Sequence, residues 1–144
     1  MSKKNEKIED LKEMLDKSAK CYGNKTIYKL ENKDISYVEM QEMVNCLGTS
    51  LLKMGLKDKK IAIISENRYE WEIAFFAISC GTGIVIPLDK SLTTKEITTV
   101  LERAEVEAVF CSEKYEKMIL EAKKDLADLK YIISFDNQGE RAFS

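Results

Sequence analysis

Apolar and polar residues alternate in two different rhythms along the first third of the chain. In residues 7–22, apolar side chains recur every three or four positions, which predicts a surface helix. Residues 26–30 and 34–37 instead alternate around a short polar turn and predict a β-hairpin. Residues 40–51 return to the helical spacing and predict a second helix, laid on a core.

From residue 60 onward, short continuous apolar runs are separated by helical segments. Such runs are typical of strands covered on both faces, and they lie at residues 61–64, 84–88, 108–111 and 131–135. Strands that alternate with helices imply right-handed crossovers. We therefore predict an α/β fold with a mostly parallel sheet of about four strands and helices on both faces, preceded by a helix and a β-hairpin.

Polar residues and glycines mark where the predicted helices begin and end. The segments 36–39 and 93–96 have the form of capping boxes. Asn67 and Ser112 are predicted to cap the helices that follow them, and Gly55 is predicted to end the helix that begins after Ser36.

The helix predicted over residues 69–80 is apolar on nearly every side, so we expect it to be largely buried. Trp71 lies in its first turn, and Phe75 follows one turn later on the same face. We expect the indole of Trp71 to be mostly shielded from water and to stack on the ring of Phe75.

The length of 144 residues suits a single domain. We expect one N-terminal α/β subdomain over residues 1–136, in which the hairpin and first helices occupy residues 1–56 and the parallel unit occupies residues 57–136. Residues 137–144 have no periodicity and are predicted to form a tail that leads into a missing remainder.

The charge balance and the absence of long apolar stretches narrow the function classes. The chain has 23 basic and 25 acidic residues, so its formal charge of -2 provides no broad basic field for nucleic acid. No apolar run approaches the roughly 20 residues that a membrane-spanning helix needs, and the charged N-terminus has no apolar signal region. These features predict a cytoplasmic protein without a transmembrane segment.

The chain has no histidine, which excludes Ser-His-Asp and Cys-His catalysis within these 144 residues. Cys21, Cys46, Cys80 and Cys111 are widely spaced and offer no C-x-x-C pair for zinc or redox exchange. We expect each of them to be a buried, reduced thiol.

The turns of the predicted sheet contain few groups suited to nucleotide chemistry. Glu66 stands alone after the first apolar strand and would repel a phosphate, and no glycine-rich phosphate loop is present. Residues 81–83, Gly-Thr-Gly, follow a helix and precede a strand, the reverse of the order in a dinucleotide-binding fingerprint, so they predict a helix end.

Two further groups are candidates of low specificity. Asp89 follows the second strand at the carboxyl edge of the sheet but has no partner residue, which favours a loop acid. Lys57, Lys59 and Lys60 form a small basic cluster without interleaved aromatic residues, which is typical of a solvated surface. The residues themselves therefore predict no catalytic, cofactor-binding or metal-binding site.

Three stretches, residues 35–40, 60–71 and 81–89, resemble the N-terminal part of AMP-forming acyl-CoA synthetases in order and spacing. The sequence Glu-Asn-Arg-Tyr-Glu-Trp at residues 66–71 is most similar to the long-chain fatty acid ligase branch. The resemblance covers about residues 36–136.

The resemblance implies a parent enzyme that activates a fatty acid with ATP and magnesium to an acyl-adenylate, and then transfers the acyl group to coenzyme A. The family's lysine-terminated loop, its acyl-adenylate motif and its ribose-binding aspartate have no matching stretch here. The resemblance therefore implies that this chain is an inactive scaffold fragment of a longer enzyme. It also implies that the enzyme is cytoplasmic or peripheral at the membrane. A fragment leaves uncovered the face on which its missing remainder would pack, and exposed apolar area favours a homo-oligomer.

A freestanding flavodoxin-like module, binding or interacting without catalysis, is the alternative. A receiver domain of that shape would carry clustered acids after its first parallel strand, where this chain has Glu66 alone. The alternative therefore has no positive motif.

Overall fold

The computed structural model describes residues 7–136. Helices and strands alternate along this part of the chain as the apolar pattern predicts. Their order is α1 (Leu11–Tyr22), β1 (Thr26–Lys29), β2 (Asp34–Ser36), α2 (Tyr37–Lys53), β3 (Lys60–Ile64), α3 (Tyr69–Ser79), β4 (Ile84–Pro87), α4 (Thr94–Arg103), β5 (Ala108–Cys111), α5 (Glu113–Lys123) and β6 (Tyr131–Ser134).

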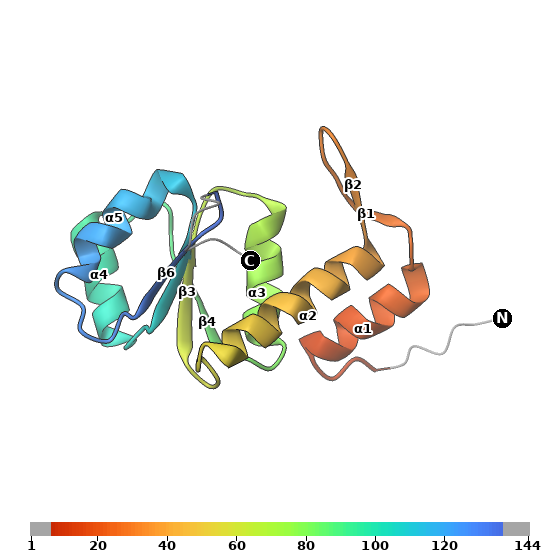
Figure 1. The fold of residues 1–144 in the computed structure, drawn as a ribbon, viewed down its shortest axis with the longest axis horizontal. Helices are drawn as coiled ribbons and strands as arrows, with labels where there is room; N and C mark the ends of the chain where they lie inside the picture. The colour runs from red at the N-terminus through yellow and green to blue at the C-terminus, as the bar shows by residue number, and fades with distance from the viewer. Residues whose placement is uncertain (1–6, 137–144) are drawn as a thin grey trace.

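The four later strands form one parallel sheet in the order β4-β3-β5-β6. Figure 1 shows α4 and α5 on one side of this sheet and α3, then α2 and α1, on the other. Strands β1 and β2 pair antiparallel as a separate hairpin beside α2. The predicted α/β class, with helices on both faces of a four-stranded parallel sheet, is confirmed.

Alternation within the central strands divides the core into two layers. Ile61 and Ile63 of β3 pack with Phe110 of β5 against the side that carries α1, α2 and α3. Ala62 and Ile64 face the opposite side and pack against α4 and α5. Because successive side chains of a strand point to opposite faces, a continuous apolar run is needed to fill both layers.

Strand β4 departs from the prediction of a strand buried on both faces. It lies at the edge of the sheet, and Ile84 at its start is 55% exposed. Its proline, Pro87, lacks an N–H for a sheet hydrogen bond, which suits an edge strand. Pro87 is thus the residue of this strand sequence that indicates an edge position, while the three apolar residues before it are equally suited to a central one.

Helix α3 is less completely buried than its composition suggests. Ile73, Ala74, Ala77 and Ile78 are buried, and Trp71 is partly buried and packs against the core, in agreement with the prediction of a mostly shielded indole. The predicted stacking is confirmed, since the rings of Trp71 and Phe75 lie 5.4 Å apart at an angle of 12°. The helix is apolar all round, while sheet and neighbouring helices cover only part of its circumference.

Both predicted capping boxes are present at their helices. Ser36 accepts a hydrogen bond from the backbone N–H of Glu39, and Thr93 accepts one from that of Glu96; the glutamate carboxylates reciprocate. Gly55 follows the end of α2 with a φ of 79°, a conformation that glycine adopts without strain.

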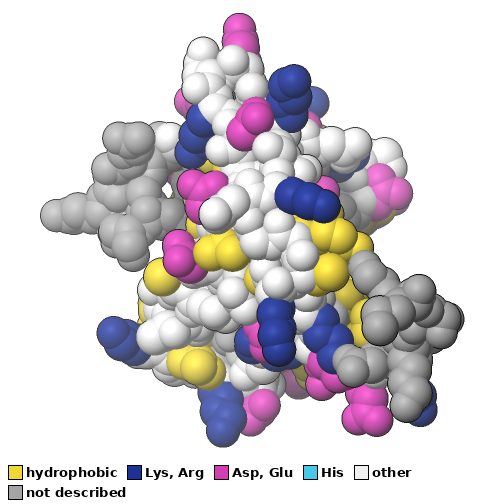
Figure 2. All heavy atoms as spheres, turned by 90° about the vertical axis from the view of Figure 1, so that its right-hand side faces the viewer, with side chains coloured by type: hydrophobic (Ala, Val, Ile, Leu, Met, Phe, Trp, Pro, Cys, Tyr) yellow, Lys and Arg dark blue, Asp and Glu magenta, His cyan; other side chains and the backbone are white. Residues whose placement is uncertain are grey.

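Helix α1 carries charges of both signs on its solvent side. Lys12 pairs with Asp16 at 2.6 Å and Lys17 pairs with Glu13 at 2.8 Å. The face seen in Figure 2 likewise has acidic and basic side chains interspersed, with smaller hydrophobic areas between them. Gln41 of α2 donates to Asp16 at 2.7 Å, which ties the two helices together.

Among residues 7–136, no helix has the length and apolar character needed to cross a membrane. The predicted tail, residues 137–144, lies outside the described part of the chain.

Candidate functional site

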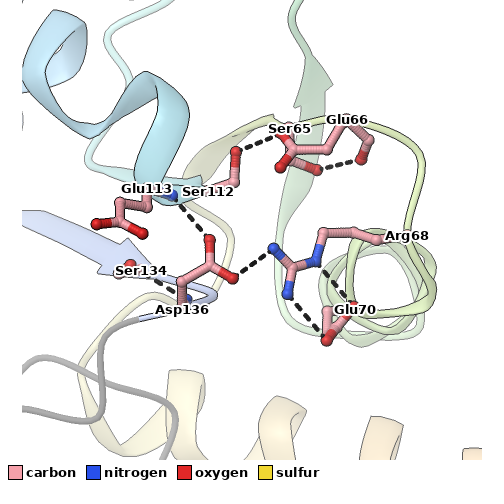
Figure 3. Close-up of polar contacts among 8 residues, drawn as sticks. All are labelled: Ser65, Glu66, Arg68, Glu70, Ser112, Glu113, Ser134 and Asp136. Carbon is pink, nitrogen blue, oxygen red and sulfur yellow. Dashed lines mark hydrogen bonds and ion pairs between the residues drawn. The ribbon is translucent and has the colours of Figure 1, made fainter. Parts of the chain in front are cut away.

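The carboxyl edge of the parallel sheet gathers a network of polar side chains, drawn in Figure 3. Its members come from the ends of β3, β5 and β6 and from the starts of α3 and α5. They are Ser65, Glu66, Arg68, Glu70, Ser112, Glu113, Ser134 and Asp136. This edge is where ligands bind in open α/β sheets, so it is the place to look for chemistry.

Arg68 is the centre of the network. Its Nε and one terminal nitrogen donate to the two carboxylate oxygens of Glu70 at 2.9 and 3.0 Å. Its other terminal nitrogen donates to Asp136 at 2.7 Å. The guanidinium also lies 5.5 Å from the ring centre of Phe135. One planar cation therefore joins the start of α3 to the end of β6.

The sequence predicted Asn67 as the N-cap of α3, and this prediction is wrong. The helix begins after Arg68, which is the N-cap residue and makes no side-chain capping bond. Glu70, three positions after Asn67, pairs with Arg68. The ion pair satisfies the carboxylate better than a cap would, because the bond is bidentate and charge-assisted.

Ser112 occupies the predicted N-cap position of α5, but its hydroxyl does not cap the helix. The hydroxyl donates to the carboxylate of Glu66 at 2.6 Å. The cap comes from Asp136, which accepts from the backbone N–H of Glu113 at 2.8 Å. Asp136, two residues after the end of β6, thus stabilises the start of α5, where a negative charge is favourable.

These contacts hold the carboxylates in their ionised form. The hydroxyl of Ser112 lowers the pKa of Glu66. The backbone N–H of Glu113, followed by Arg68, lowers the pKa of Asp136. Burial opposes ionisation of Glu70, but the hydrogen bonds from Arg68 prevail and its pKa is also lowered. Glu70 raises the pKa of Arg68 in turn.

An open apolar groove of about 390 Å³ adjoins this network. It lies between α2 and α3 and reaches the end of β6. Its lining is mostly apolar with one carboxylate at the side, and includes Met43, Cys46, Leu47, Glu70, Ile73 and Phe135. Glu70 therefore belongs both to the ion-pair network and to the groove.

The remaining candidates from the sequence are occupied by local contacts. The carboxylate of Asp89 accepts from the backbone and hydroxyl of Ser91 at 2.8 and 2.7 Å, as expected of a loop acid. At Gly83 an added Cβ would lie 2.3 Å from the carbonyl oxygen of Lys59. The Gly-Thr-Gly sequence thus ends α3 and lets β4 start close to β3.

Two lysines of the basic cluster, Lys59 and Lys60, lie beside acidic residues. Lys59 pairs with Glu107 at 2.9 Å, and Lys60 lies 3.7 Å from Glu105. Glu107 also pairs with Lys130 at 2.9 Å.

The cysteines are free thiols, but not all of them are buried as predicted. Cys111 is buried, and burial raises its pKa to about 12. Cys80 is half-buried, whereas Cys21 and Cys46 are exposed. Both exposed thiols lie off the apolar stripes of α1 and α2, and the general tendency of cysteine to be buried does not override that position.

The geometry of the network is that of a structural joint. Within residues 7–136, every buried side-chain nitrogen and oxygen has a hydrogen-bond partner. The same residues contain no group of three or more acidic or sulfur-bearing side chains placed to hold a metal ion. Sequence reasoning missed this joint because its members are far apart in sequence; Arg68 and Asp136 are separated by 68 residues.

Solved structures share this fold. A putative long-chain-fatty-acid CoA ligase from Rhodopseudomonas palustris superposes with a TM-score of 0.83 at 20% identity, over 92% of this chain and 34% of that chain. The anthranilate CoA ligase AuaEII superposes with a TM-score of 0.82 at 16% identity, over 88% and 25%. The fold of this chain is therefore one that also occurs as a part of these longer proteins.

Sequence relatives place the chain within a family. It is 32% identical over 143 residues to fatty acyl-CoA synthetase B of Dictyostelium discoideum, and 31% identical over 111 residues to long-chain-fatty-acid–CoA ligase 1 of Homo sapiens. These alignments cover 92% and 73% of this chain but only 21% and 16% of the relatives. The family of AMP-binding enzymes matches residues 15–143, and the chain belongs to that family.

Proposed function

We propose that this chain is the N-terminal scaffold part of a ligase that activates a long-chain fatty acid with ATP and transfers it to coenzyme A. The observation that carries the proposal is the family match over residues 15–143, together with relatives named as fatty acyl-CoA synthetases and long-chain-fatty-acid–CoA ligases. The match favours a part of a ligase over a freestanding flavodoxin-like module.

The proposed reaction has two steps. The fatty acid carboxylate attacks the α-phosphate of ATP, which forms acyl-adenylate and releases pyrophosphate. The thiol of coenzyme A then displaces AMP and leaves the acyl group as a thioester. Both steps need charge stabilisation where negative charge develops on the phosphates, and in the enzymes that this chain resembles magnesium and a lysine supply it.

We assign a structural role to the charged side chains at the sheet edge. Arg68 is engaged by Glu70 and Asp136, and Asp136 also holds the start of α5. Neither the guanidinium nor these carboxylates form a cradle for a triphosphate or a magnesium ion, so we assign them no step of the reaction. We assign them instead to holding the sheet edge rigid, as a second layer of chain packed against it would require.

The isolated chain should therefore be inactive. The measurement is fatty-acid-dependent exchange of labelled pyrophosphate into ATP with the purified 144-residue chain, with a complete relative as the positive control. We expect exchange no faster than the protein-free blank. Exchange above the blank that depends on the fatty acid would contradict the assignment of a scaffold.

A second observation tests the parent enzyme. If the coding sequence continues beyond Ser144, we expect it to encode a loop rich in Ser, Thr and Gly that ends in lysine. A continuation without that loop would contradict membership of an active ligase.

A further inference from the structure

The groove between α2 and α3 is an apolar surface that the described residues leave open. Met43 and Leu47 line it from α2, Ile73 lines it from α3, and Phe135 lines it where the chain leaves β6. Met43, Leu47 and Phe135 are only partly buried. A partner that covered the groove would remove their remaining apolar area from water, which is favourable.

Two polar side chains of the groove already have partners within the chain. The carboxylate of Glu70 accepts two hydrogen bonds from Arg68, at 2.9 and 3.0 Å. The hydroxyl of Ser50 donates to the backbone carbonyl of Cys46 at 3.0 Å. Because a polar group that keeps its hydrogen bonds can be buried at little cost, this groove suits a partner that excludes water from it.

An anionic ligand is disfavoured at this groove. The charged residue in its lining is Glu70, a carboxylate. The guanidinium of Arg68 beside it already pairs with Glu70 and Asp136. A phosphate or the carboxylate of a fatty acid would therefore meet negative charge there. The occupant that fits is a protein surface with apolar side chains, as in the core of an interface.

The shape of the groove separates two protein occupants. In a twofold homodimer the same patch lies on both sides of the contact, so one groove would face another and neither would be filled. A convex surface of a different part of the protein can fill it. The chain spans only 21% and 16% of the two relatives named above. Under the proposed function, most of the ligase is therefore available to supply that surface.

The groove is continuous with the joint at the sheet edge. Glu70 belongs to both, and the ring of Phe135 lies 5.5 Å from the guanidinium of Arg68. Phe135 also stacks on Phe110 of the core, with 5.8 Å between the ring centres. The joint and the core thus hold this part of the lining in place, and a preformed surface binds at a lower entropic cost.

We propose that the groove between α2 and α3 is the surface on which the rest of the ligase packs, and that a convex apolar surface of that remainder fills it. This inference rests on the proposed function, and it assigns a place to the contact that a scaffold part must make. Cys46 and Leu47 of α2 would lie inside the contact.

Cys46 provides the direct test, because it lines the groove and is exposed in this chain. Cys21, an exposed thiol on α1, is the reference, and the buried Cys111 reports unfolding. Iodoacetamide is the probe, and peptide mass spectrometry follows the alkylation rate of each cysteine. The 144-residue chain is compared with a chimera in which it replaces the matching segment of fatty acyl-CoA synthetase B of Dictyostelium discoideum.

We expect Cys46, measured relative to Cys21, to be alkylated about tenfold more slowly in the chimera, because a covered thiol reacts only when the contact opens. An unchanged ratio in a chimera that forms acyl-CoA would overturn the inference and leave the proposed function standing. Slower alkylation of Cys46 in a folded chimera that forms no acyl-CoA would support the inference and contradict the proposed function. Protection of Cys46 in the isolated chain that disappears on dilution would assign the groove to a second copy and would overturn the inference.

A binding measurement covers a chimera that fails to fold, which fast alkylation of Cys111 would reveal. The 144-residue chain, carrying a tag, is produced together with the Dictyostelium synthetase that lacks its matching segment, and the two are purified through the tag. We expect the truncated synthetase to be recovered with the chain.

Substitutions at the two exposed cysteines make this measurement specific for the groove. Both positions are exposed, so neither substitution should unfold the chain. Cys46→Glu places a carboxylate in the apolar contact and should lower the recovery about tenfold, whereas the matched control Cys21→Glu should leave it unchanged. No recovery with the unsubstituted chain, or equal recovery with both variants, would overturn the inference.

Discussion

At the scale of single residues, Arg68 determines the geometry of the sheet edge. Its side chain is 21% exposed and contacts two carboxylates from different parts of the chain, Glu70 and Asp136. A lysine could supply the charge but not the fork that holds both partners, because only the guanidinium has several donors in one plane.

Removing that fork should destabilise the fold. In Arg68→Ala, two partly buried carboxylates lose their cation, and we expect the free energy of unfolding to fall by about 2 kcal/mol, the magnitude for hydrogen bonds to charged groups. Arg68→Lys, the matched control, should lose less. Urea unfolding followed by circular dichroism measures both, and an unchanged midpoint in Arg68→Ala would contradict the role of this residue.

The same network predicts how stability depends on pH. The pKa values of Glu66, Glu70 and Asp136 are lowered in the folded chain. As pH falls, the unfolded chain therefore takes up protons first, so the contribution of these groups is present above the unfolded pKa and is lost through the folded pKa.

We expect the free energy of unfolding to decrease as pH falls from about 5 to about 3, the range just around and below ordinary carboxyl pKa values. Asp136→Asn removes one of the titrating groups, so its decrease over the same range should be shallower. Urea titrations at several pH values measure this, and parallel curves for the two proteins would show that Asp136 does not contribute.

At the scale of elements, α3 is a buried helix with one uncovered side. Ile78 is fully buried, while Trp71 is half-buried and stacks on Phe75. The sheet and α2 cover the side that carries Ile78. An apolar helix can therefore be recognised from its sequence, but how much of it is covered depends on neighbours that the sequence pattern does not place.

This difference orders two substitutions by their cost. Ile78→Ala deletes a fully buried side chain and should cost about 2–5 kcal/mol. Trp71→Ala removes only part of an indole from contact and should cost about 1–2 kcal/mol, less than a fully buried tryptophan would. Tryptophan emission of the native protein and urea midpoints of both variants test this. A larger loss in Trp71→Ala than in Ile78→Ala would contradict the placement of α3.

Sequence patterns predicted the elements well because their causes are local. The capping boxes at Ser36 and Thr93 depend on residues three positions apart, and the two-residue period of β3 follows from strand geometry. The sheet-edge joint depends on contacts between distant segments. Nothing near Ser112 in the sequence indicates that Glu66 would take its hydroxyl or that Asp136 would cap its helix.

At the scale of the whole molecule, apolar side chains remain open to solvent at several places among the described residues. Ile84 on the edge strand β4 is 55% exposed, and Trp71 and Phe75 are half-buried on α3. Exposed apolar area favours association. An edge strand also has unpaired backbone groups that a second chain can bind.

We therefore propose that the 144-residue chain forms a homodimer or a larger species. Ile84→Lys places a charge on the edge strand and should shift the population toward monomer, whereas Leu120→Lys, at a 41% exposed position on α5, should leave it unchanged. Sedimentation velocity over a range of concentrations measures both. If the unsubstituted 144-residue chain is a monomer at high concentration, the proposal is contradicted.

We propose that this chain is the N-terminal scaffold part of a fatty acid–CoA ligase, and a chimera tests that proposal directly. The most direct measurement replaces the matching segment of fatty acyl-CoA synthetase B of Dictyostelium discoideum, to which the chain is 32% identical, with this sequence. Fatty-acid-dependent release of AMP by the purified chimera is then compared with that of the unmodified relative. We predict that the chimera forms acyl-CoA. Adding Arg68→Ala should lower the free energy of unfolding of the chimera and leave the activity of the folded chimera largely unchanged. A folded, soluble chimera that binds ATP but forms no acyl-CoA would contradict the claim.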